Sequence, residues 1–220
     1  MEWSVPLQKL EVAKVQLGNI FTKPTQEKKP VVLLSYVDGQ IVMPVFTVLL
    51  PHLTIESYNE TNGRLELLVD TQWASSKLLT LQKTLLENIY HSQSAWFGSN
   101  KYSLDDICRL FQPMIEGNKL HLYCPVATSA IKSEARRSGS TQYERKKPYG
   151  TKVWKDNCWF EGIPPGSLLE GTKVRVAIQI QGISLQVGVT ENGWTGRSRL
   201  QHRILAVLIP NAKKPECLLD

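Results

Sequence analysis

The chain has 220 residues, of which 42% are hydrophobic, and it carries a formal net charge of +6. This composition is sufficient for one sizeable core, and it excludes a disordered or fibrous protein. No apolar run approaches the length that crosses a bilayer, and the N-terminus lacks the basic start and apolar core of a signal peptide. We therefore expect a soluble, intracellular protein with no membrane partner.

Alternating hydrophobic residues and turn signals predict an N-terminal part built from β-strands. Asp38-Gly39 and Asn62-Gly63 are preferred pairs for tight turns, so they predict two hairpins. Pro44 and Pro51 limit regular pairing, because proline cannot donate to a strand ladder. The predicted strands are Val5–Leu17, Val31–Val37, Gln40–Leu50, Leu53–Tyr58 and Arg64–Val69.

The hydrophobic period then changes to that of an α-helix. Ser75-Ser76 is a suitable N-terminal cap for a helix that runs to about Ser94, and Gly98 is a suitable C-terminal cap. A second helix is expected to begin after Ser103. Residues 73–113 are therefore expected to form a helical insertion, followed by a short strand. The apolar residues at helical spacing in the first helix are Leu78, Leu81, Leu85, Leu86 and Ile89.

Residues 132–155 carry the net positive charge of the chain. This window holds eight of the 26 basic residues and two of the 20 acidic residues, so the rest of the chain carries 18 of each sign. Its first part, Ser133 to Gly150, has almost no residue that could form a core, which predicts a mobile basic loop. The basic residues are Lys132, Arg136, Arg137, Arg145, Lys146, Lys147, Lys152 and Lys155.

Aromatic residues lie among these cations. Tyr143 and Tyr149 lie within the loop, and Trp154 follows it. Cations that neutralise phosphates, together with rings that stack on bases, are the combination that single-stranded nucleic acid needs. The alternative interpretation is a solvated loop whose aromatic side chains return to the core.

The segment Gly171–Val187 predicts a long strand with two chemically different faces. Successive side chains of a strand point to opposite faces, and here apolar residues alternate with basic and amide residues. The alternation reverses at Gly182, which predicts a bulge or bend that returns the later apolar residues to the same core. The outer set is Lys173, Arg175, Gln179 and Gln181, and the inner set is Val174, Val176, Ile178 and Ile180.

A second strand with a cationic face follows the turn-forming sequence Glu191-Asn-Gly193. Two neighbouring rows of cations and amides form a surface that can follow a phosphate backbone, although an ordinary solvated sheet face is the alternative. Trp194, beside the turn, is a candidate for stacking on a base or an aromatic that packs on the end of the sheet. The outer set is Arg197, Arg199, Gln201 and Arg203, and the inner set is Leu200, His202, Ile204, Ala206 and Leu208.

These elements together predict a mainly β, α+β fold: a small β-barrel with an inserted helical pair and a long basic loop. The OB-fold is the expected barrel, because it has five strands and binds oligonucleotides on one strand face and in its loops. We expect one nucleic-acid-binding domain over residues 1–220. Within it lie the helical insertion at 73–113, the basic loop at 132–155 and the long barrel strands at 171–209.

The sequence favours a binding protein over an enzyme. Asp105-Asp106 lies at a helix start, where its effect on the helix dipole explains it, and no glycine-rich phosphate loop is present. The cysteines have no pair at the spacing of a zinc site, so we expect free thiols and no metal or other cofactor. A nuclease is the less favoured alternative, and an RNA-binding or structural protein with a cationic partner-binding face is the other. The cysteines are Cys108, Cys124, Cys158 and Cys217.

The order of these segments resembles the OB-fold single-stranded DNA-binding proteins of nucleocytoplasmic large DNA viruses. The resemblance covers most of the chain from about Pro30 to Ile209 and depends on order and spacing. Its most specific parts are Trp96-Phe-Gly98 after a helix and Gly171-Thr-Lys-Val followed by Gly182. The final strand departs from the family pattern, because it begins with charged residues where an aromatic or small apolar entry is expected.

This resemblance implies a non-enzymatic protein that coats single-stranded DNA, largely without sequence preference, during viral DNA replication, repair or recombination. It implies a location in the cytoplasmic viral factory or the nucleus of the host. Single-stranded DNA is the expected ligand, and RNA, replication proteins and a second copy of the chain stay open as partners. The residues expected at the interface are Lys173, Arg175, Gln179, Arg197, Arg199, Arg203, Arg136, Arg137, Arg145, Lys146, Lys147, Tyr143, Tyr149, Trp154 and Trp194.

Overall fold

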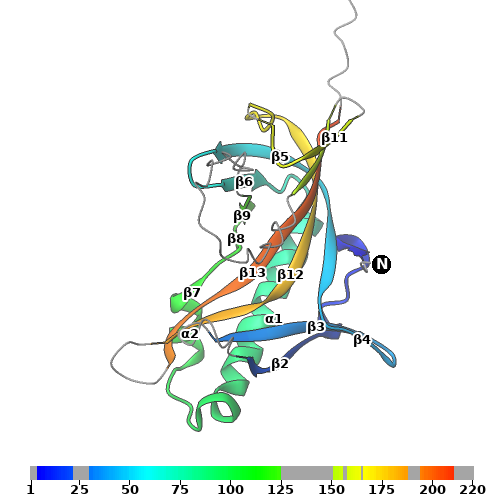
Figure 1. Ribbon diagram of the computed structural model, residues 1–220. Coiled ribbons are helices and arrows are strands. Elements are labelled where there is room, and N and C mark those ends of the chain that lie inside the picture. The colour runs from blue at the N-terminus through cyan, green and yellow to red at the C-terminus, as the bar shows by residue number, and fades with distance from the viewer. Residues whose placement is uncertain are drawn as a thin grey trace, which may run out of the picture.

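A computed structural model describes residues 4–21, 30–124, 151–155, 158–164, 166–187 and 194–210. Strands hold 52% and helices 24% of the described residues, so the expected mainly β, α+β class is confirmed. Figure 1 shows two long strands, β12 (Lys173–Val187) and β13 (Trp194–Leu208), that run side by side through the molecule with one long helix beside them. The basic loop predicted over Ser133–Gly150 lies outside the described residues.

The N-terminal segment forms two short strands where the alternation of Val5–Leu17 predicts one. Pro6 precedes a 3₁₀ turn in which Leu10 N–H donates a hydrogen bond to Leu7 O (3.2 Å). This turn buries Leu7 and Leu10 together, a spacing that strand alternation does not describe. The elements are β1 (Ser4–Pro6), 3₁₀ turns at Leu7–Lys9 and Val12–Lys14, and β2 (Val15–Phe21).

Both predicted hairpins are present, but the expected break at Pro51 is absent. The pairing of β5 with β12 slips by one residue beside Pro51. Such a bulge leaves a position without a ladder hydrogen bond, and proline is tolerated there. One strand therefore replaces the second half of Gln40–Leu50 and all of Leu53–Tyr58. The strands are β3 (Val31–Asp38), β4 (Ile41–Met43), β5 (Phe46–Asn59) and β6 (Arg64–Leu68).

The described residues contain two α-helices, α1 (Gln72–Phe97) and α2 (Leu104–Leu110). The five apolar residues predicted for the core side of α1 are buried, and Gly98 ends the helix with a φ of 75°. Ser75 does not cap the helix, because α1 begins after Thr71 and Ser75 Oγ donates to Gly117 O (2.8 Å). Ser103 caps α2 as expected, in a capping box with Asp106.

The strands form one sheet with the main order β11-β10-β13-β12-β5-β6-β9-β8. Next to this order, β3 pairs with β12, β2 pairs with β3, and β7 pairs with β13. No described strand pair joins the two ends, so the sheet is open and the expected OB-fold barrel is not confirmed. The strands not yet given are β7 (Phe111–Gln112), β8 (Ile115–Glu116), β9 (Lys119–Tyr123), β10 (Lys152–Lys155) and β11 (Cys158–Glu161).

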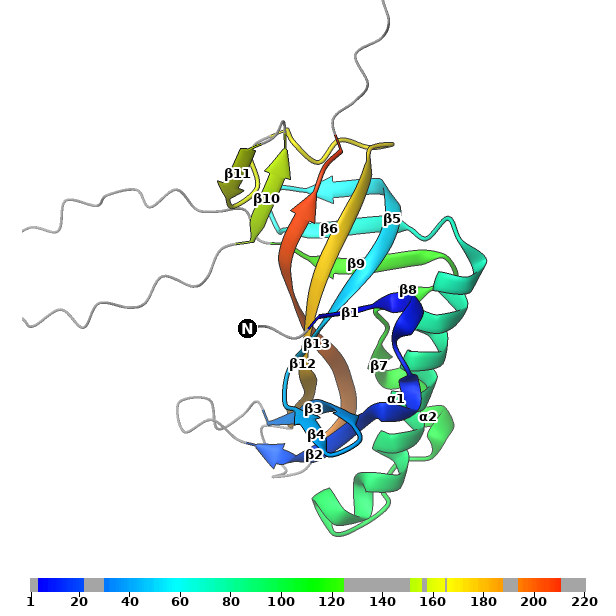
Figure 2. The same cartoon turned by 90° about the vertical axis from the view of Figure 1, so that its right-hand side faces the viewer.

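The core lies between the inner face of the curved sheet and α1, which runs along one side of it (Figure 2). Val174, Val176, Ile178 and Ile180 of β12 are all at most 2% exposed. Their burial confirms the inner set that alternation predicts for β12. The outer set of the same strand therefore points away from α1.

Gly182 reverses the alternation of β12 as predicted. The pairing of β12 with β13 slips between Ile180 and Gly182, and Ile183 is fully buried after it. A Cβ on residue 182 would lie 2.4 Å from Val32 O of β3. The absence of a side chain therefore allows β3 to pair with β12 at this point.

A second slip, in β13, lies opposite the step from Ala177 to Ile178 and was not predicted. After it Val207 is fully buried, whereas Ala206 and Leu208 are half-buried. The prediction that Ala206 and Leu208 belong to the inner set is therefore wrong. One extra residue reverses every later position of a strand, and a run that is apolar on both faces gives no sign of it.

Candidate nucleic-acid interface

The outer face of β12 and β13 is cationic, and neither strand contains a carboxylate. Gln179 lies opposite Arg203 and Ser184 lies opposite Arg199, so the outer rows of the two strands are contiguous. We call this surface the cationic stripe. Its exposed members are Lys173, Arg175, Arg197 and Arg199, and its half-buried members are Gln179, Gln181, Gln201 and Arg203. The structure therefore brings the predicted strand residues onto one face.

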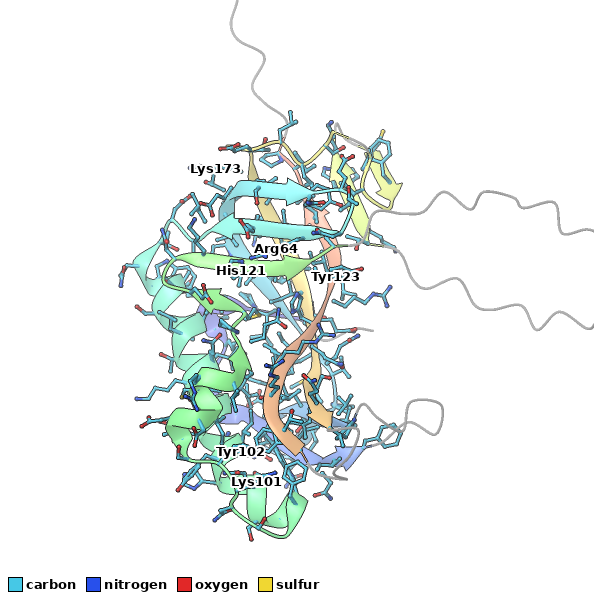
Figure 3. All side chains as sticks on the ribbon, turned by 90° about the vertical axis from the view of Figure 1, so that its left-hand side faces the viewer. Arg64, Lys101, Tyr102, His121, Tyr123 and Lys173 are labelled. Atoms are coloured by element: carbon cyan, nitrogen blue, oxygen red, sulfur yellow. The ribbon has the colours of Figure 1, made fainter. Side chains whose placement is uncertain are left out.

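A cleft of about 750 Å³ lies beside the cationic stripe, between β13 and the hairpin of β8 and β9. Gln181, Arg199 and Gln201 of the stripe line it. The opposite lining includes Arg64 on β6 and Tyr123 on β9, which Figure 3 shows on neighbouring strands beside β13. The cleft and the stripe are thus one continuous surface.

The cleft exists because β9 approaches β13 without forming a backbone ladder with it. β7 pairs with β13 at Ser198–Arg199, and β10 pairs with it at Ala206–Leu208. Between these two pairings, Tyr123 N–H donates a hydrogen bond to His202 Nε2 (3.2 Å). This contact between a backbone and a side chain joins the two strands and leaves space on the outer side.

His202 makes this contact as a neutral imidazole. Burial lowers the pKa of His202 below its usual value, and the nearby charge of Arg199 adds to this shift. Because Nε2 accepts the hydrogen bond from Tyr123, the ring proton resides on Nδ1. The link between β9 and β13 is therefore complete at neutral pH.

Tyr123 is the exposed aromatic residue of the cleft. It is 57% exposed, although its backbone is held both by His202 and by the ladder to Arg64 of β6. A ring on a fixed backbone loses little freedom when it stacks on a flat ligand. Tyr123 therefore presents an exposed ring on a fixed backbone at the cleft.

The cleft lining contains two arginines, Arg64 and Arg199, and one carboxylate, Glu116. Arg64 is already engaged, because its Nη2 lies 2.9 Å from Glu66 Oε1. The Ser57 hydroxyl donates to Glu66 Oε2 (2.9 Å) and, with the charge of Arg64, holds the pKa of Glu66 below its usual value. Glu66 therefore stays ionised at neutral pH. Arg199 is exposed, and no ion pair to it occurs among the described residues.

Trp194 is buried, so the prediction that it stacks on a base is wrong. It is 3% exposed, and its ring stacks on Phe97 with centroids 5.2 Å apart and an interplanar angle of 16°. Its Nε1 donates to Arg197 O (2.9 Å), and Tyr102 contacts its ring edge-on. The alternative interpretation, an aromatic that packs on the end of the sheet, is the one observed.

Of the remaining predicted residues, the structure describes only Trp154, which is not part of the cleft lining. Trp154 is half-buried on β10, opposite Trp159 and Leu208. The loop residues lie outside the described residues; they are Arg136, Arg137, Tyr143, Arg145, Lys146, Lys147 and Tyr149.

Cys124 and Thr151, the last and first described residues on either side of 125–150, lie close together next to β13. Cys124 directly follows Tyr123, and its Sγ lies 3.8 Å from Thr151 Oγ1. Thr151 Oγ1 donates to Ile204 O of β13 (3.0 Å), and the Tyr58 hydroxyl donates to Cys124 O (3.0 Å). Burial raises the pKa of the Cys124 thiol to about 11, so this cysteine has a structural role.

Tyr123 and Arg64 were not predicted as site residues. In Leu120-His-Leu-Tyr123 the leucines alternate with outward residues, so the sequence does carry a signal that Tyr123 is exposed. It carries no signal that β9 lies beside β13, because Tyr123 and His202 are 79 residues apart.

Comparison of the chain with protein-family models, curated proteins and solved structures finds no significant match. In the described part of the chain, no helix is long and apolar enough to span a membrane. Within the same residues, no three His, Cys, Asp or Glu side chains are grouped as metal ligands. Cys108, Cys124 and Cys158 are free thiols, and Cys217 lies outside the described ranges.

Proposed function

We propose that the chain binds single-stranded DNA along the cationic stripe and the adjoining cleft, without catalysis and largely without sequence preference. One observation carries the proposal. Two paired strands present five cations and no carboxylate on one face, next to a cleft that contains an exposed aromatic ring. The five cations are Lys173, Arg175, Arg197, Arg199 and Arg203.

The spacing of the cations suits a phosphate backbone. Arg197, Arg199 and Arg203 share one side of β13, and alternate residues of a strand are roughly 7 Å apart. In the proposed complex each guanidinium contacts a different phosphate of an extended strand. Gln201 lies between two of them and offers an amide to the same path. Contacts of this kind depend on the backbone of the ligand and give little sequence preference.

The exposed ring of Tyr123 favours a single strand over a duplex. In a duplex the faces of the bases are covered by their neighbours, whereas a single strand can place one base on a protein ring. Stacking is also tolerant of sequence, because every base has a flat face.

The resemblance to viral single-stranded DNA-binding proteins supplies the finer part of this proposal. The curved sheet, the bend at Gly182 and the position of the cationic stripe on its longest strands support an OB-fold-like arrangement. In that role the chain would protect or present single-stranded DNA during viral replication, repair or recombination, in the viral factory or the nucleus of the host. Replication proteins would then be its partners.

Variants of Tyr123 test the proposal at the cleft. We expect Tyr123→Ala to weaken binding of a labelled single-stranded oligodeoxynucleotide about tenfold, because loss of one stacked base removes about 1–3 kcal/mol. Tyr123→Phe should bind as the wild type does, since it keeps the ring. Fluorescence anisotropy at one salt concentration measures both. Wild-type affinity in Tyr123→Ala, or an equal loss in Tyr123→Phe, would contradict stacking at this residue.

A further inference from the structure

Phe21, the last residue of β2, is turned to the outer face of the sheet by a bulge. Val15 of this strand is buried, and strict alternation from it would send Phe21 to the core. The pairing of β2 with β3 slips by one residue between Leu17 and Ile20. The extra residue reverses the later positions, so Phe21 is 49% exposed.

The register of the sheet places Phe21 in one row with Arg199. Phe21 lies opposite Val31 on β3, and Val31 lies opposite Ser184 on β12. Ser184 in turn lies opposite Arg199 on β13. Directly opposite residues of antiparallel strands point to the same face. A phenyl ring and a guanidinium group therefore share the outer face, three strand spacings or about 14 Å apart.

The neighbouring row has the same character. Leu33 of β3 is 45% exposed and lies opposite Gly182, which lies opposite Gln201 on β13. Between Phe21 and Arg199 the row contains Val31 of β3 and Ser184 of β12; Val31 is 9% exposed and its side chain packs over Gly182. The views in Figures 1 and 2 agree that β2 and β3 lie beside the same end of β12 and β13.

We infer that these two rows form a base-binding subsite for a single nucleic-acid strand. A base stacks on Phe21 and contacts Leu33, while the phosphates of the same stretch contact Arg199. A single strand carries flat apolar bases and phosphates along its length, so a strand with one base on Phe21 can place the phosphate of a neighbouring nucleotide at Arg199, about 14 Å away. The inference rests on the proposed function. It adds that a base of the bound nucleic-acid strand faces β2 and β3 while its phosphates face β13.

The chemistry of the face favours this occupant over an apolar protein partner. Arg199 is exposed on a surface whose two long strands hold no carboxylate, so an apolar partner over Phe21 and Leu33 would leave that charge without an anion. A base together with its phosphates satisfies both groups at once. The subsite is separate from Tyr123, which lies on the opposite side of β13.

An abasic ligand separates base contacts from phosphate contacts. We expect Phe21→Ala to weaken binding of a thymidine oligonucleotide about tenfold and to leave binding of an abasic oligonucleotide of equal length unchanged. Phe21→Trp should bind the thymidine oligonucleotide as tightly as the wild type does. Trp73→Ala, which removes an aromatic ring that is 44% exposed on α1, should bind both ligands as the wild type does.

Each other outcome overturns a defined part of the inference. Unchanged thymidine binding in Phe21→Ala, or an equal loss on both ligands, excludes base stacking at this residue. If Phe21→Ala changes the sedimentation coefficient but not thymidine affinity, then the patch is a contact between protein chains. Failure of the wild-type protein to bind the thymidine oligonucleotide would instead overturn the proposed function itself.

Discussion

Replacing Arg175, Arg199 and Arg203 together by alanine should flatten the plot of log affinity against log salt concentration by about two units. A single-stranded ligand releases about 0.7 counterions for each phosphate that a protein neutralises, so three contacts account for this change. At 0.1 M salt the same loss corresponds to roughly 100-fold weaker binding. Titrations of a labelled oligodeoxynucleotide at four or more salt concentrations measure the slope.

A charge-matched variant controls for the loss of three positive charges. Lys9, Lys83 and Arg109 lie on helical segments and are not members of the cationic stripe, and all three are exposed. Their combined replacement by alanine changes net charge equally and should leave the slope close to that of the wild type. If both triple variants lower the slope equally, then the net charge of the protein and not the stripe determines binding.

Replacing Gly182 by alanine should destabilise the fold by about 3 kcal/mol, at the upper end of the cost of overpacking. The added Cβ would meet a backbone oxygen, Val32 O, at 2.4 Å, so β3 must move away from β12. For a chain of this size the midpoint of thermal unfolding should fall by roughly 6–12 °C. Thermal melts followed by circular dichroism measure the change.

Gly18 provides the matched control for Gly182. A Cβ at residue 18 would lie 3.4 Å from Leu33 O, which is an ordinary contact, so Gly18→Ala should melt close to the wild type. A Gly182→Ala protein that melts with the wild type would show that β3 does not approach β12 as closely as described. The Gly182→Ala change should also weaken binding of the thymidine oligonucleotide, because β2 and β3 carry Phe21 and Leu33 of the proposed base subsite.

Side-chain alternation predicted most of the faces correctly, because burial on one side of a sheet imposes a period of two. It predicted the inner residues of β12 and the reversal at Gly182, where a glycine marks the bend in the sequence. It predicted the core side of α1 equally well, since Leu78, Leu81 and Leu85 recur at helical spacing. These signals are local, so one sequence contains them.

A bulge with no marker in the sequence caused the error in the parity of β13. The slip in β13 after Ile204 lies in a run that is apolar on both faces, so no residue type records it. The slip in β2 lies at Gly18-Asn19, between Leu17 and Ile20, and the predicted strand ended at Leu17, so no face was predicted for Phe21. For this reason alternation gave no indication that Phe21 is exposed.

The cleft could not be predicted, because it depends on contacts between distant segments. Tyr123 and His202 meet only after β6, β9 and β13 have been placed in the sheet. Trp194 illustrates the opposite case. Its position beside a turn suggested exposure, but the end of α1 supplies Phe97, whose ring covers it.

The most direct test of the central claim is a comparison of single-stranded and duplex DNA of equal length and sequence, measured with the wild-type protein at one salt concentration. Cations alone would bind both, whereas rings that require exposed base faces select the single strand. We expect at least tenfold tighter binding of the single strand, and single-stranded RNA in the same assay shows whether the sugar matters. Equal affinity for the single strand and the duplex would contradict the account and reduce the surface to a general cationic patch.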